Sequence, residues 1–182
     1  MKVYIVLTHT GTVLTRLIRL FTRKPFNHAS ISFDRQLSAV YSFGRKNPKN
    51  PFCGGFVQED MEGILFRRAS CAIYSLEITE DQFERMKEFL LEVEKEKEKY
   101  RYNLLGLFYV LFNKERNRDY AYFCSEFVAT MLDRGGVPLP KKSAHLVRPY
   151  DFAECGQFEL VFQGPLQAYL SKTRTPAVHM AG

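Results

Sequence analysis

The feature that most limits the fold is the clustering of short apolar runs in the N-terminal part of the chain. These runs are rich in β-branched and aromatic residues and are separated by turn residues, which is typical of short strands. Because consecutive strands with short connections pair antiparallel, the pattern predicts an α+β domain in which an antiparallel sheet packs against helices. The runs span residues 2–8, 28–33, 38–44, 55–59, 63–69 and 71–78, with a later one at 158–164.

Helical spacing dominates the rest of the chain. Thr79 and Gln82 have the spacing of a capping box, which predicts a helix from there to about Tyr100. A second helix is expected to begin near Cys124 and to end at Gly135.

Two further segments have helical character. Residues 12–24 form a basic amphipathic pattern, and residues 103–113 are apolar all round. We expect the second segment to be a buried helix, with a membrane-surface element as the alternative.

The length of 182 residues fits one domain with a sizeable core. We expect residues 1–170 to form this domain and residues 171–182 to be a disordered tail. The longest apolar run, 104–112, is about half of the length that spans a bilayer. Arg16 and Arg19 interrupt the N-terminal segment where a secretory signal needs an apolar stretch. The sequence therefore predicts a cytoplasmic protein.

The net charge of +6 is unevenly distributed. Residues 1–50 carry nine Lys or Arg and one acid, Asp34, which gives +8 for that stretch. This predicts a solvated basic face, and weak contact with an anionic membrane surface is a further expectation. Nucleic-acid binding would also require exposed aromatic residues in a recognisable module, and the sequence has none, so no nucleic-acid partner is predicted.

The four cysteines, Cys53, Cys71, Cys124 and Cys155, lie far apart, without the paired spacing of metal ligands. We predict free thiols, no metal site and no cofactor.

Cys124 differs from the other three cysteines in its position, because it stands at the start of a predicted helix. The helix dipole lowers the pKa of a thiol at that position, and the helix N–H groups can hold an oxyanion. A small buried core residue is the alternative interpretation.

A reactive cysteine needs a base within hydrogen-bond reach of its sulfur. His28 is the strongest candidate because it opens a short predicted strand, and a strand beside a helix N-terminus can hold an imidazole there. His145, in a loop, is the rival. His9 and His179, at a strand end and in the tail, are less suited.

Three stretches together resemble a known superfamily: NHASISFD (27–34), AVYSFG (39–44) and YFCSEFVATML (122–132). They look like the NlpC-type papain-fold superfamily in its circularly permuted branch. This branch includes YiiX-like bacterial proteins and, more distantly, lecithin retinol acyltransferase. In it, the histidine strand precedes the Cys-Ser-Glu helix, which reverses the order in papain. The resemblance covers roughly residues 1–165 and implies a permuted papain-like fold.

The resemblance also implies roles for individual residues. Cys124 would be the nucleophile and His28 its base. The family usually adds a polar residue on the neighbouring strand, about a dozen positions after the histidine, to orient the imidazole. His, Glu, Asn and Gln are absent at that spacing, so Tyr41 is the first candidate and Ser42 the second. For Tyr41, an ordinary strand aromatic is the alternative.

Three more residues are candidates for the substrate pocket. Tyr122 could form a pocket wall or donate a hydrogen bond, and Asn27 could fix the entry to the histidine strand. Glu126 has a structural interpretation as well, because an acid in the first turn favours the helix dipole.

By this resemblance, the chain is a cysteine-dependent hydrolase or acyltransferase that acts on an amide or ester through a thioester on Cys124. The expected partner is a small amide, peptide or lipid substrate. The alternative is a catalytically weak or inactive papain-like fold used as a ligand- or membrane-binding module, and the absence of the usual third residue favours it.

Overall fold

The computed structural model describes residues 1–11, 23–47, 50–102, 121–139 and 142–174. The predicted helix at 103–113 and all but the end of the one at 12–24 lie outside these residues, as do residues 175–182 of the predicted tail. The described chain is an α+β structure.

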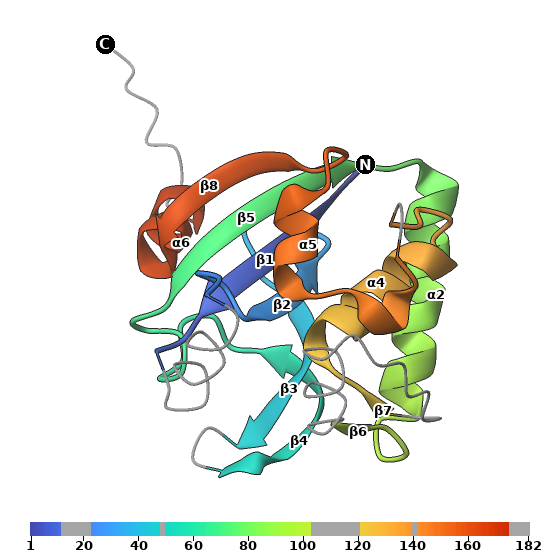
Figure 1. The fold of residues 1–182 in the computed structure, drawn as a ribbon, viewed down its shortest axis with the longest axis horizontal. Helices are drawn as coiled ribbons and strands as arrows, with labels where there is room; N and C mark the ends of the chain where they lie inside the picture. The colour runs from blue at the N-terminus through green and yellow to red at the C-terminus, as the bar shows by residue number, and fades with distance from the viewer. Residues whose placement is uncertain (12–22, 48–49, 103–120, 140–141, 175–182) are drawn as a thin grey trace.

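A six-stranded sheet forms the centre of the described structure, in the order β4-β3-β2-β1-β5-β8, and every neighbouring pair is antiparallel (Figure 1). The clustering of the strand patterns therefore predicted the sheet type correctly. The strands are β1 (Lys2–His9), β2 (His28–Ser32), β3 (Val40–Asn47), β4 (Asn50–Glu59), β5 (Ser70–Glu77) and β8 (Glu159–Pro165).

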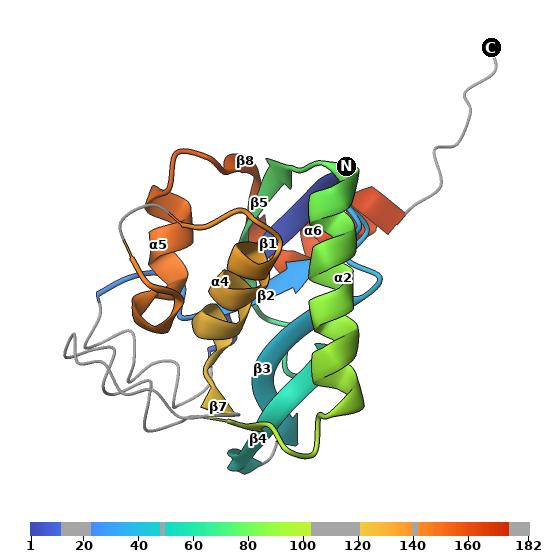
Figure 2. The same cartoon turned by 90° about the vertical axis from the view of Figure 1, so that its right-hand side faces the viewer.

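Helices cover both faces of this sheet. α2 and α4 pack against each other on one face, with α5 beside them, and α6 lies on the opposite face (Figures 1 and 2). The helices are α2 (Glu80–Lys95), α4 (Cys124–Arg134), α5 (Pro149–Glu154), α6 (Leu166–Arg174) and the 3-10 turn η1 (Ala144–Leu146). A short parallel pair, β6 (Arg101–Tyr102) and β7 (Ala121–Tyr122), leads into α4.

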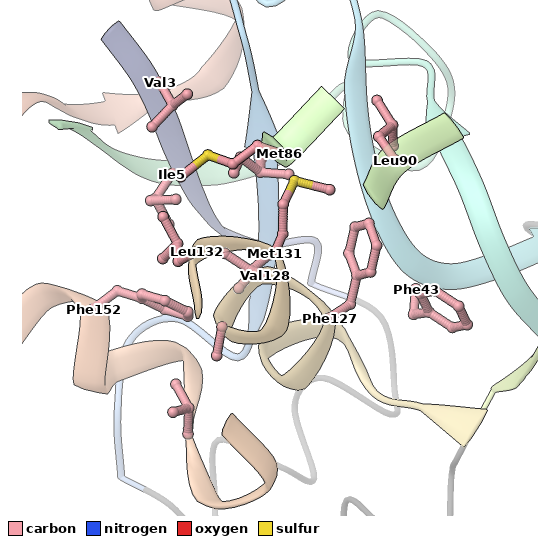
Figure 3. Close-up of a cluster of buried hydrophobic side chains, with 14 of the residues drawn as sticks. Val3, Ile5, Phe43, Met86, Leu90, Phe127, Val128, Met131, Leu132 and Phe152 are labelled. Atoms are coloured by element: carbon pink, nitrogen blue, oxygen red, sulfur yellow. The ribbon is translucent and has the colours of Figure 1, made fainter. Parts of the chain in front are cut away.

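The alternation of β1 explains why both faces are covered. Ile5 points into the cluster formed with α2 and α4, where Met86, Phe127 and Met131 interdigitate (Figure 3). Its neighbour Val6 points into the second cluster, which α6 closes. Successive strand side chains face opposite sides, so an all-apolar strand requires a partner on each.

Local signals of the sequence set several boundaries. The Thr79 side chain accepts from the Gln82 N–H, and the Gln82 side chain accepts from the Thr79 N–H, which confirms the predicted capping box. In the β2–β3 turn, the Asp34 carboxylate accepts from the backbone of Ser38 and Ala39. Side-chain to backbone bonds of this kind are what make Asp a turn residue.

The predicted strand at 63–69 is wrong. This segment forms consecutive turns, in which the N–H of Phe66 donates to Gly63 and the N–H of Ala69 donates to Phe66. Phe66 and Ala69 are buried, whereas Ile64 is exposed. The two buried residues, Phe66 and Ala69, are therefore three positions apart, whereas a strand would bury every second residue.

Element ends differ from the prediction in three other places. The Pro-rich segment 46–55, predicted to be a loop, supplies the end of β3 and the start of β4. β4 is an edge strand, where proline removes no ladder hydrogen bond that another strand needs. α2 ends at Lys95 rather than near Tyr100, and α6 includes residues 171–174 of the predicted tail.

Among the described residues, we find no helix with the length and apolar character that a bilayer crossing requires.

Candidate functional site

Cys124 is the first residue of α4. Phe123 before it is extended, with φ −104° and ψ 169°, and the N–H of Phe127 donates to the Phe123 carbonyl to close the first helical turn. The first N–H groups of a helix have no acceptor within the helix. Cys124 therefore stands at the positive end of the helix dipole, as the sequence predicts.

His28 opens β2, and this strand packs against α4. The backbone fixes its position, because His28 pairs with Thr8 of β1 and the preceding Asn27 N–H donates to the Thr8 carbonyl. The Cys124 thiol lies near the His28 ring and raises the pKa of this imidazole. The structure thus brings together two residues that are nearly a hundred positions apart in the sequence.

Glu59, the last residue of β4, lies on the other side of the imidazole. Its Oε1 atom is 2.6 Å from the Nε2 atom of His28. The Ser42 hydroxyl donates to the same oxygen at 2.7 Å, and the Ser30 hydroxyl donates to Oε2 at 2.6 Å. Because Nε2 faces Glu59, Nδ1 is the ring nitrogen that remains for the sulfur. Cys124, His28 and Glu59 therefore form a thiol–imidazole–carboxylate series.

The electrostatics of this series favour a protonated imidazole. Burial alone lowers the pKa of His28, but the charges of Glu59 and Cys124 and hydrogen bonds to both raise it well above its ordinary value of 6.5. Burial alone raises the pKa of Glu59. The charge of His28 and the hydrogen bonds from His28, Ser30 and Ser42 outweigh this effect and lower that pKa below 4.5. An ionised Glu59 therefore lies on one side of a protonated imidazole, and Cys124 lies near that positive charge.

The series has little contact with solvent. Cys124 is 2 % exposed, and the His28 side chain is 16 % exposed. The sulfur is nevertheless beside a polar imidazole rather than in a wholly apolar setting. The other described thiols differ. Burial raises the pKa of Cys71 to about 12, and Cys155 is partly exposed. These three cysteines are free, as predicted, and the side chain of Cys53 lies outside the described residues.

The group at Nε2 of His28 is Glu59, and not Tyr41 or Ser42 as the sequence predicted. Tyr41 packs against the core, with its ring stacked on Phe56 at a centroid distance of 6.0 Å. Ser42 points to the opposite face of β3 and contacts Glu59. The prediction was wrong because it placed the polar group on β3, the strand next to that of His28, whereas Glu59 lies on β4, the strand beyond β3.

Sequence reasoning missed Glu59, although one signal pointed to it. The run 55–59 ends on a glutamate two residues after Val57, and residues two apart in a strand share a face. An acid on the inward face of a predicted strand needs a buried partner. Only the pairing of β3 with β4 reveals which partner this is.

Glu126 and its partner form a second acid–imidazole pair. The Glu126 Oε1 atom is 2.5 Å from Nδ1 of His145 in η1, and Oε2 accepts from the Phe123 N–H. Ser125 adds a further link, since its hydroxyl donates to the Val147 carbonyl at 2.7 Å. Glu126 therefore caps α4 and fastens η1 to it, in agreement with the structural interpretation. His145, the predicted rival base, faces this carboxylate.

The two remaining pocket candidates are both next to the series in sequence. Asn27 is buried, and its Nδ2 atom is 3.4 Å from Nδ1 of His9. The Tyr122 ring packs between aromatic rings, stacked on Tyr100 and edge-on to Phe43. The structure thus places Tyr122 as a wall beside α4, and its role toward a substrate stays a prediction.

Within the described part of the chain, no group of three or more His, Cys, Asp or Glu side chains is arranged to hold a metal ion. Comparisons with models of protein families, with curated proteins and with solved structures find no match for this chain. The functional interpretation therefore depends on the residues of the site.

Proposed function

We propose that the protein is a cysteine-dependent hydrolase or acyltransferase of the permuted papain-like type, acting on an amide or ester. The observation that supports this proposal is the shared imidazole. The His28 ring lies near the Cys124 thiol, which raises the pKa of the imidazole, while the Nε2 atom of His28 is 2.6 Å from the Glu59 carboxylate. A nucleophile, a base and a group that orients the base are the parts that acyl transfer through a thiol requires.

The first step follows from the protonation states. The Cys124 thiolate attacks the acyl carbon, and the carbonyl oxygen becomes an oxyanion near the N–H groups at the start of α4. When the tetrahedral intermediate collapses, the bond to the leaving amine or alcohol breaks, and protonated His28 supplies the proton that this group takes away. The product is a thioester on Cys124 with a neutral His28.

The second step regenerates the site. Neutral His28 removes a proton from water or from another acyl acceptor, which then attacks the thioester carbon. The bond to sulfur breaks, and the thiolate and protonated imidazole form again. Water gives hydrolysis, and an amine or alcohol gives acyl transfer. Glu59 holds the imidazole orientation through both steps and stabilises its positive charge.

The test is alkylation by iodoacetamide at pH 6, followed by peptide mapping. We expect Cys124 to react at least about tenfold faster than the partly exposed Cys155, because a thiolate and not a thiol is the nucleophile. His28→Ala should abolish this difference. His145→Ala is the matched control, because it removes an imidazole that faces Glu126 instead. Cys124 reacting no faster than Cys155 in the wild type would refute the proposal.

A second candidate function is a binding module that keeps the fold without turnover. The burial of Cys124 favours it, since only 2 % of that residue reaches solvent. A panel of small esters, amides and lipid analogues separates the two functions. A ligand that binds wild type and Cys124→Ser equally, with no thioester detected by mass spectrometry in the wild type, identifies the binding module.

A further inference from the structure

Beyond the thiol and imidazole, the site contains a group of small residues around Glu59. Ser30 and Ser42 are both fully buried, and each donates its hydroxyl to the Glu59 carboxylate. Together with Nε2 of His28, they supply three hydrogen bonds to the two carboxylate oxygens. A buried carboxylate is stable as an anion only when such donors surround it.

The Glu59 side chain has to cross one strand to reach His28. It starts on β4 and contacts Ser30 and His28 on β2, so it passes over β3. The residues of β3 beneath it are small. A Cβ atom on Gly44 would be 3.1 Å from the Ser42 hydroxyl and 3.5 Å from Oε1 of Glu59. Gly44 therefore leaves the space in which this carboxylate and hydroxyl meet.

The next serine of β2 provides an internal comparison. Ser32 is also fully buried, and it shares the face of Ser30 because it is two residues further along the strand. Its hydroxyl donates to the Ala39 carbonyl and not to Glu59. Serine burial on this strand therefore serves two different purposes.

Few other titratable groups surround Glu59. His28 from β2 contacts it, and Cys124 from α4 lies beyond that ring. Asp60 follows it and accepts from the Glu62 backbone. His9, at the end of β1, contacts Asn27. On α4 and η1, Glu126 and His145 form a hydrogen bond with each other, and in β7 the pKa of Tyr122 is raised, chiefly by burial.

We propose that Ser30 and Ser42 are positioning residues that keep Glu59 ionised and aimed at His28, and that Gly44 preserves the space they require. This inference rests on the proposed function, since it assigns the residues that set the strength of the His28 base. Without the two hydroxyls, the buried carboxylate would take up a proton more readily, and His28 would lose its charged partner.

The experiment measures the pKa of His28 directly, by NMR of the imidazole in a Cys124→Ser background. Removing both donors with Ser30→Ala and Ser42→Ala should lower this pKa by about one unit, the scale of the effect of a nearby opposite charge. In proteins that keep Cys124, the same pair of changes should raise the pH at which iodoacetamide reacts with it. Ser32→Ala is the control, and it should leave both quantities unchanged.

Each outcome separates the inference from the proposed function. An unchanged His28 pKa in the double variant, with rapid His28-dependent alkylation intact, overturns the inference alone. Slow alkylation of Cys124 in the wild type overturns the proposed function whatever the serines do. If the double variant fails to fold, Ser42→Ala alone tests the same prediction with one donor removed. Gly44→Ala should also lower the His28 pKa. A rise in this pKa would contradict the role of Gly44 in preserving space for the Glu59 carboxylate and the Ser42 hydroxyl.

Discussion

Two histidine–glutamate pairs lie near the start of α4, and they differ in ways that the residue types alone do not reveal. In the first pair, His28 and Glu59 have side chains 16 % and 6 % exposed. In the second, His145 is 41 % exposed over an equally buried Glu126. Glu59 has two serine hydroxyls as additional donors, whereas Glu126 has one backbone N–H.

Burial raises the pKa of both carboxylates, but the net shifts of the two are in opposite directions. For Glu126, burial raises the pKa, and the bonds from His145 and Phe123 offset only part of this rise. For Glu59, His28 and the two serines overcome burial and lower the pKa. The comparison shows that the number and charge of the donors around a buried acid decide its protonation state. In the first pair, the lowered pKa of Glu59 and the raised pKa of His28 favour a positively charged imidazole near Cys124.

The largest expected effect is on the reactivity of the thiol. Glu59→Gln removes the charge that holds His28 protonated, so the Cys124 sulfur should lose the positive charge beside it and become less reactive. The rate of alkylation at pH 6 should then fall about 10- to 100-fold. Glu126→Gln should change that rate less than about threefold, because Glu126 already faces His145. An equal fall of the alkylation rate in the two variants would show that the two histidine–glutamate pairs do not differ in their effect on Cys124.

The next effect is on the pH dependence of stability. Glu59 has a lowered pKa, so its contribution is present above its unfolded value near 4.5 and is lost as the pH falls through the folded value. Glu126 has a raised pKa, so the free energy of unfolding falls as the pH rises from about 4.5 through the folded value. The advantage of wild type over Glu59→Gln should therefore shrink below pH 4.5. The advantage over Glu126→Gln should shrink above that pH.

Urea titrations at several pH values, with intrinsic fluorescence as the probe, measure both differences. His28 adds a second pH-dependent contribution to the stability that Glu59→Gln removes. Its raised pKa gives a contribution that is fully present below pH 6.5 and is lost as the pH rises through the folded value. Parallel pH profiles for the two glutamine variants would contradict the opposite shifts.

The smallest effect is on overall stability at neutral pH when the exposed partner is removed. His145→Gln should lower the free energy of unfolding by about 1 kcal/mol or less, because the glutamine amide can still donate a hydrogen bond to the buried Glu126 carboxylate. It should leave the alkylation rate of Cys124 within about twofold of wild type. Thermal unfolding and alkylation measured on the same preparations check both. A large loss of thiol reactivity would assign His145 to the site with His28.

Much of the fold follows from local patterns. The capping box at Thr79 and the extended Phe123 before Cys124 are encoded within a few residues, so the starts of α2 and α4 could be predicted. The spacing of apolar residues likewise gave β1, β2 and β5 nearly to their ends. The turns at 63–69 show the limit, because a short apolar run fits both a strand and a turn until its burial is known.

The sequence by itself determined that a cysteine stands at the first position of a helix and a histidine at the first position of a strand. These are local properties, set by backbone geometry within one turn or one strand. The tertiary structure alone decided which acid faces the histidine. Glu59 reaches His28 only because β4, β3 and β2 lie in this order, with small residues on the strand between them. Sheet order and register depend on contacts between distant segments, and no local pattern in the chain contains them.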